Sequence, residues 1–272
     1  MKLNVKNGLA TITIKADLYL RNTKNITASY SGTYKYEEAK ANTVTAQIKK
    51  REAKITLTAT PTKQKQYNTI TFTAKLEDTT PNTKNKTAIN TNNKVIFKIN
   101  GVTIKDKNDK NLEVKVTNST ATYKYTVPQG MGGVTSEGDT RNYEASCVLI
   151  SENYYPDTRD DTIFNVERSP TTIQISRVSV NTKNQLSIKA ILKDYKGNKL
   201  IGDSTVNIKI NGKSYVNPKT NKQENFKVTG GVINLSNLEL KSGITVKSVT
   251  IVTGDRQAYL GQRNTTTNIV KA

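Results

Sequence analysis

The chain contains no histidine and no tryptophan, and it has a single cysteine among its 272 residues. Without histidine it lacks the commonest general base and the commonest neutral metal ligand, and it cannot form a Ser-His or Cys-His catalytic pair. One cysteine excludes an intrachain disulfide. The sequence therefore argues against an enzyme, and we expect no cofactor and no metal site.

The one cysteine, Cys147, lies in a stretch with alternating apolar residues. Tyr143, Ala145 and Leu149 occupy every second position around it, which places the thiol on the same face of a strand as these side chains. A thiol with no histidine near it is a poor nucleophile. We predict that Cys147 is a small buried core residue.

Long apolar runs are also missing, since only 34% of the residues are apolar. No stretch approaches the roughly 20 apolar residues of a membrane span. Residues 1–7 lack the apolar core of a signal peptide. We therefore expect no membrane insertion by this segment, and we expect the targeting and anchoring parts of a surface protein to lie outside this sequence.

What the chain does contain is a repeat. Lys94-Val-Ile-Phe-Lys-Ile-Asn-Gly101 returns as Thr205-Val-Asn-Ile-Lys-Ile-Asn-Gly212. Apolar residues at every second position predict a strand, and Asn-Gly predicts the two-residue hairpin turn that follows it. Thr69–Asp78 likewise matches Gln185–Asp194, apolar on apolar. Asn100 and Asn211 are 111 positions apart, a spacing that suits an immunoglobulin-like (Ig-like) sandwich.

The repeat divides the chain into three units, and it predicts an all-β protein of tandem Ig-like β-sandwich domains. Residues 52–168 and 169–272 each form a full sandwich. Residues 1–51 match only the C-terminal half of such a unit, so the first domain is incomplete. Because a half sandwich has no opposite sheet to cover it, we expect its apolar face to be exposed.

Two short segments between strands stand out. Gln129-Gly-Met-Gly-Gly133 is an insertion that neither neighbouring unit matches, so Gly130, Met131 and Gly132 belong either to a functional loop or to a spacer. The linker Arg168-Ser-Pro170 is very short, which predicts a stiff connection between the two full units.

The net charge of +20 is unevenly distributed. Residues 1–51 carry +7, residues 52–169 carry +2 and residues 170–272 carry +11. Such a balance attracts anionic polymers. Alternatively, the lysines form solvated strand faces that resist aggregation. The sequence argues against nucleic acid as a partner, because few aromatic side chains are free for base stacking.

Other motifs are weak. Asp106–Asn111 resembles a calcium loop, but Lys110 replaces an oxygen ligand, so a polar turn is predicted. Five Asn-x-Ser/Thr sequons permit surface glycosylation: Asn25, Asn85, Asn118, Asn234 and Asn264.

One stretch carries a resemblance. Ala28–Asn42 contains Tyr30, Gly32, Tyr36 and Ala39 in an arrangement that resembles the closing signature of bacterial-type Ig-like repeats in the adhesin-like surface proteins of methanogenic archaea. The resemblance implies an extracellular, multi-repeat cell-surface protein without catalytic residues.

These observations favour a non-catalytic cell-surface stalk or adhesion module. Its partners would be neighbouring Ig-like units and host or microbial surface glycans or anionic polymers. The alternative is a carbohydrate or cell-wall polymer binding module, with the insertion near Gly130 and exposed Tyr154 or Tyr155 at its site.

Overall fold

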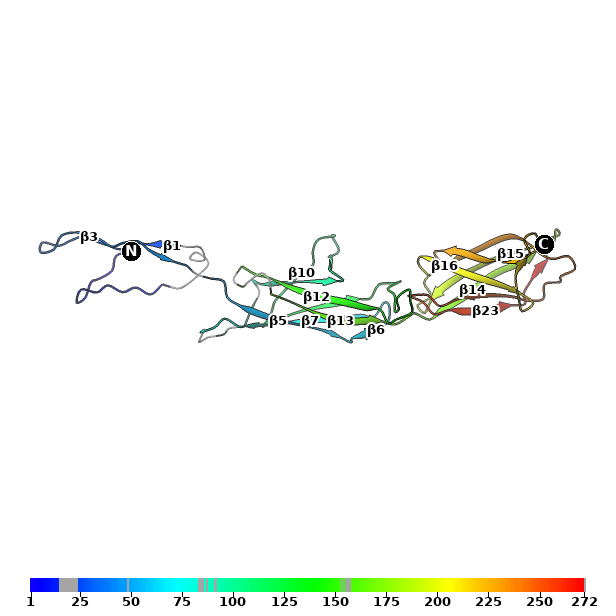
Figure 1. Cartoon of the computed structure of the whole chain (residues 1–272), viewed down its shortest axis with the longest axis horizontal. Coiled ribbons are helices and arrows are strands. Elements are labelled where there is room, and N and C mark those ends of the chain that lie inside the picture. Colours follow the sequence, from blue (N-terminus) through cyan, green and yellow to red (C-terminus); the bar gives the residue numbers. More distant parts are fainter. Residues whose placement is uncertain are drawn as a thin grey trace.

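The structure, a computed structural model, describes residues 1–14, 24–47, 49–82, 86, 88–90, 92–152, 154 and 158–271. Every regular element in these ranges is a β-strand, so the predicted all-β class is confirmed. The same ranges contain no helix that could cross a membrane. Two Ig-like sandwiches follow one another along the longest axis, and the N-terminal strands lie beyond the first of them (Figure 1).

The first sandwich packs a small sheet against a larger one. The small sheet has the order β11 (Thr120–Thr126), β7 (Thr69–Asp78) and β5 (Ala53–Thr60). The larger sheet has the order β10 (Glu113–Lys115), β8 (Lys94–Ile99), β12 (Asn142–Ile150), β13 (Arg159–Val166) and β6 (Lys63–Gln64), with β9 (Val102–Thr103) beside β8. Sequentially distant strands are neighbours in both sheets, as an Ig-like sandwich requires.

The core of this sandwich is aromatic at its centre. The Phe72 ring lies 5.6 Å from that of Phe164 and 6.2 Å from that of Phe97, centroid to centroid, and all three side chains are fully buried. Cys147 is also fully buried, so its predicted place in the core is confirmed. Alternating residues of β7, β8 and β12 thus fill the space between the sheets.

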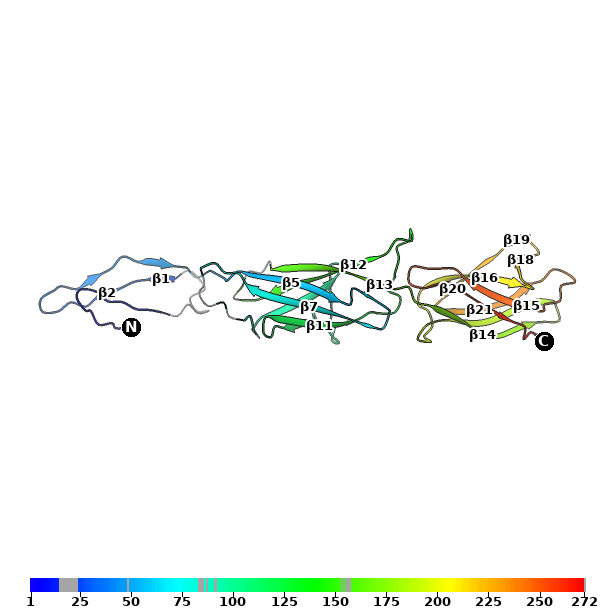
Figure 2. The same cartoon turned by 90° about the horizontal axis from the view of Figure 1, so that it is seen from below.

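The second sandwich repeats this plan. One sheet has the order β21 (Val232–Glu239), β15 (Gln185–Asp194), β14 (Thr171–Val180) and β24 (Val270–Lys271). The other has the order β17 (Lys213–Ser214), β16 (Asp203–Ile210), β22 (Val249–Thr253) and β23 (Gln262–Thr266), with β20 (Asn225–Thr229) beside β16. A small ribbon joins β18 (Val216–Asn217) to β19 (Lys222–Gln223). Figure 2 shows both sandwiches from below.

Both predicted Asn-Gly turns are present. Asn100 and Gly101 have φ angles of 47° and 78°, and Asn211 and Gly212 have φ angles of 49° and 83°. Positive φ at both central residues defines the type I′ hairpin. Because β8 pairs with β12 and β16 pairs with β22, the repeated sequence occupies the same place in each sandwich.

The N-terminal segment has paired strands without a packed core. β1 (Lys24–Ile26) pairs with β4 (Val44–Ala46), and β2 (Ser29–Tyr30) pairs with β3 (Ala39–Lys40). The apolar side chains of Ile14, Ile26 and Val44 are 57%, 45% and 64% exposed. The expected exposure of apolar residues in the N-terminal segment is therefore confirmed.

Candidate functional site

The junction between the two sandwiches is organised by one fully buried amide, that of Gln66. Its Nε2 donates to the carbonyl oxygens of Met131 and, across the junction, Ala258, at 3.2 and 3.1 Å. Its Oε1 accepts the N–H of Gly130 at 3.1 Å. Because three backbone groups depend on one side chain, Gln66 ties the insertion to both sandwiches.

Asp194, at the end of β15, provides the second link. Asp194 is buried, with only 1% of its surface exposed. Oδ1 accepts the N–H groups of Lys196 and Asn198, each at 2.9 Å. Oδ2 accepts the Tyr67 hydroxyl at 2.5 Å and the Gln129 amide at 3.1 Å, both from the first sandwich. The carboxylate therefore closes its own turn and holds the neighbouring unit, and hydrogen bonds to a charged acceptor are the stronger kind.

Two tyrosines cover this network. The Tyr67 and Tyr195 rings lie 6.2 Å apart, and the Tyr195 hydroxyl donates to the Gln66 carbonyl oxygen at 2.5 Å. Burial and then the hydrogen bond to Asp194 raise the pKa of Tyr67 from 10.0 to about 12. The junction therefore favours the protonated phenol.

This shift predicts that alkali loosens the junction. The folded state holds the phenolic proton of Tyr67 more tightly than the unfolded state does, so its contribution is complete below pH 10 and is lost as the pH rises toward about 12. The distance between two spin labels, one on each sandwich, should change with this transition when it is measured as the pH is raised. Because other groups ionise in the same range, Tyr67→Phe is the control: a transition that is unchanged in this variant would contradict the assignment.

The insertion after β11 is part of the junction. Gly130 has φ +81°, and a Cβ atom there would lie 2.4 Å from Ile201 Cδ1 of the second sandwich. Gly133 donates its N–H to the Gln257 carbonyl oxygen at 2.7 Å. Gly132 accepts the Tyr143 hydroxyl at 2.9 Å. Glycine is thus required where the loop touches the neighbouring unit.

The linker is held on both sides. The Ser169 N–H donates to the Ala258 carbonyl oxygen, and the Leu260 N–H donates to the Ser169 carbonyl oxygen, each at 2.9 Å. Arg168 forms an ion pair with Asp255 at 2.9 Å. With so few residues and so many fixed contacts, the connection has little freedom to bend.

A cleft of about 450 Å³ lies beside this linker. Its walls come from the first sandwich, the insertion and the second sandwich, and they include Lys63, Val134, Thr140, Glu167 and Leu260. Ligand sites are frequent at such boundaries between domains.

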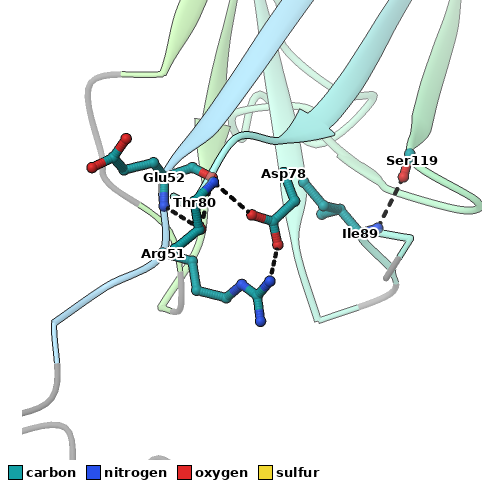
Figure 3. Close-up of polar contacts among 6 residues, drawn as sticks. All are labelled: Arg51, Glu52, Asp78, Thr80, Ile89 and Ser119. Carbon is teal, nitrogen blue, oxygen red and sulfur yellow. Dashed lines mark hydrogen bonds and ion pairs between the residues drawn. The ribbon is translucent and has the colours of Figure 1, made fainter. Parts of the chain in front are cut away.

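At the other end of the first sandwich, the chain enters beside a related carboxylate (Figure 3). Asp78 is 4% exposed, pairs with Arg51 and accepts the Thr80 N–H at 3.0 Å. Burial alone would raise the pKa of Asp78, but the hydrogen bonds from Thr80 and the ion pair with Arg51 outweigh it and lower that pKa. At this end the carboxylate of Asp78 is held by Arg51, just as the carboxylate of Asp194 is held by Tyr67 at the junction.

The predicted exposure of Tyr154 is wrong. Tyr154 is 6% exposed, packs in the first core, and forms a bridge to Arg51 where the chain enters. Its ring is buried because the Tyr154 N–H donates to Ser151 Oγ at 3.1 Å beside the Arg51 bridge, which holds the side chain against the first core. Tyr155 lies outside the described residues. The structure thus places Tyr154 and the insertion at opposite ends of the first unit.

The sequons differ in accessibility. Asn25, Asn118 and Asn234 are exposed. The exposed Asn264 donates its side-chain amide to the Ile173 carbonyl oxygen at 2.7 Å, so its nitrogen already has a structural role. Asn85 lies outside the described residues.

The turn near Asp106 is polar, as predicted. Asp106 Oδ1 accepts the N–H groups of Asn108 and Lys110 at 2.8 and 3.0 Å. Within the described ranges, no three acidic or cysteine side chains are grouped to hold a metal ion.

Cys147 is expected to be unreactive in the folded protein. Burial raises the pKa of its thiol from 9.0 to about 12, and the thiolate is the reactive form. A thiol reagent at pH 8 should label it only after denaturation, as mass spectrometry would show. Rapid labelling of the native protein would contradict its burial.

No protein-family model and no curated protein matches the chain. Among solved structures it is similar to the titin Ig tandem domains A164-A165, with a TM-score of 0.40, 8% identity, and coverage of 83% of this chain and 99% of that one. It is also similar to the Yersinia pseudotuberculosis adhesin InvE, with a TM-score of 0.38, 16% identity, and coverage of 78% and 58%. A third is the mouse nectin-like molecule 4 ectodomain (Ig1-Ig3), with a TM-score of 0.32, 11% identity, and coverage of 83% and 67%. At these identities the likeness is one of fold.

Proposed function

We propose that this chain is a segment of a non-catalytic, extracellular cell-surface protein, in which tandem Ig-like units provide reach and make weak contact with anionic or glycan surfaces. The units would be residues 1–51, 52–168 and 169–272. The observation that carries the proposal is the junction centred on Gln66 and Asp194, which fixes one sandwich to the next.

A fixed junction supports a spacer for a physical reason. Bending would expose or strip partners from the buried groups of Gln66 and Asp194, and each unsatisfied buried group costs about 1–3 kcal/mol. The chain enters each sandwich at one end and leaves it at the other (Figure 1). Units joined in this way add their lengths.

The setting of the spacer is part of the proposal. The resemblance of Ala28–Asn42 to repeats of archaeal adhesin-like proteins supports a place in a methanogen surface protein. A net charge of +20 supports attraction to anionic polymers, which weakens as salt screens the charges.

Distance measurements test the stiffness. Spin labels at Lys75→Cys and Lys189→Cys, exposed positions on β7 and β15, would report across the junction, while buried Cys147 remains unlabelled. We expect one narrow distance distribution, which should broaden when Gln66→Ala removes the shared amide. A broad distribution in the parent protein would contradict a stiff spacer.

The cleft beside the linker favours a second candidate function, a carbohydrate-binding module. It combines charged Lys63 and Glu167 with apolar Val134 and Leu260, a mixture found in ligand pockets. Binding on a glycan array that survives high salt and disappears in Val134→Arg would support it. Binding that disappears with salt alone would favour contact through charge.

A further inference from the structure

The end of the second sandwich away from the junction carries exposed lysines on both of its sheets. On one sheet, Lys271 faces Val180 in the β14–β24 pairing, and Lys183 and Lys241 flank the hydrogen bond between Asn184 and Leu240. All three lysines are exposed.

The other sheet adds two more. Lys213 follows the Asn211-Gly212 turn, and the Lys247 N–H donates to Asn211 Oδ1 at 2.8 Å. The Tyr215 hydroxyl donates to the Glu239 carbonyl oxygen at 3.1 Å, which brings the two sheets together at this end. We call this group the lysine end: Lys183, Lys213, Lys241, Lys247 and Lys271.

The lysine end is a concentration of unpaired positive charge. Its five members form no ion pair within the described ranges, whereas nearby Lys219 is paired with Glu239 at 2.6 Å. Charges of one sign on a common surface raise the local concentration of anions. An anionic partner would therefore find five free ammonium groups here.

This end differs from its counterpart in the first sandwich. Pairing of Ala53 with Asp78 and of Thr171 with Asp194 sets the same register in both units. In that register, Lys183 takes the place of Tyr67. The side chain that holds the next unit at the junction is thus replaced by a charge that is costly to bury.

The kind of polyanion follows from what accompanies the charge. Proteins that bind single-stranded nucleic acids use aromatic side chains on which the bases stack. In the described part of the second sandwich, the large apolar side chains that are exposed are aliphatic: Ile201, Val232, Ile244 and Val270. A positively charged surface without exposed aromatic rings suits an acidic polysaccharide, whose anionic groups are attached to sugar rings.

We propose that the lysine end binds an acidic polysaccharide through its carboxylate or sulfate groups. This inference rests on the proposed adhesive function and deepens it, because it places the contact at one end of the second sandwich.

The test compares two variants of the full chain with equal loss of charge. One changes the five residues of the lysine end to glutamine. The control changes five exposed lysines of the first sandwich to glutamine: Lys54, Lys75, Lys107, Lys115 and Lys124. Binding to polygalacturonate, heparin, neutral dextran and a single-stranded oligonucleotide is measured at low and high salt, and melting curves confirm that each variant is folded.

We expect the lysine-end variant to lose affinity for the acidic polysaccharides by about tenfold or more and to show a weaker dependence on salt, because fewer counterions are released. The control should lose much less. Equal losses in both variants would overturn the proposal, as would tighter binding of the oligonucleotide than of a polysaccharide that carries the same charge. Either result would leave weak anionic contact intact. Absence of binding to every polyanion would overturn both, and the spacer role would still be judged by the label distances.

Discussion

Replacing Phe72 with alanine is expected to destabilise the first sandwich by about 3–5 kcal/mol. Phe72 is fully buried, and its ring contacts those of Phe97, Phe164 and Tyr125. Truncation would leave a cavity at the point where the two sheets meet. Neighbouring strands carry ladder hydrogen bonds and cannot collapse to fill it.

The effect should be confined largely to one unit. Differential scanning calorimetry of Phe72→Ala should show one transition shifted far down and the other shifted little. The matched control is Phe226→Ala, at a half-buried aromatic of the second sandwich. It should lower the transition of the second sandwich by less than Phe72→Ala lowers that of the first. A joint fall of both transitions to the same extent would show that the sandwiches unfold as one body.

Removing the carboxylate of Asp194 is the second large expected change. Asp194→Ala should destabilise the second sandwich and its junction by about 3–5 kcal/mol. Two backbone N–H groups, the Tyr67 hydroxyl and the Gln129 amide all lose their acceptor. Denaturant unfolding and the label distances would record the two consequences separately.

Asp106→Ala supplies the control for this change. Asp106 accepts two backbone N–H groups in the same pattern as Asp194 does, but it touches no second unit. The difference between the two variants therefore isolates the junction. A double-mutant cycle with Tyr67→Phe should show coupling to Asp194 and none to Asp106. Equal destabilisation by both alanine variants would mean that the junction contributes nothing.

The strands and turns could be predicted because their causes are local. Alternation of apolar residues in Lys94–Ile99 and Thr69–Asp78 settles which face of each strand is buried, since side chains alternate across a sheet. Asn100-Gly101 settles the turn, because both residues tolerate positive φ. The burial of Cys147 followed from the same alternation.

The junction residues were missed because their partners are far away in the sequence. Gln66 meets Ala258, 192 positions later, and Tyr67 meets Asp194, 127 positions later. One available signal was the unmatched insertion at Gln129–Gly133, and another was the change from Tyr67 to Lys183 between otherwise matched units. Neither signal says which surface the side chains will touch.

The sequence by itself determined the all-β class and the repeated hairpins, since these follow from the alternation of side chains and from the turn chemistry of neighbouring residues. Only the tertiary structure decided that Tyr154 is buried, that the insertion contacts the second sandwich, and that the lysines of two sheets meet at one end. Each of these depends on how separate strands pack, and the free energy of that packing is a property of the assembled core and not of any one segment.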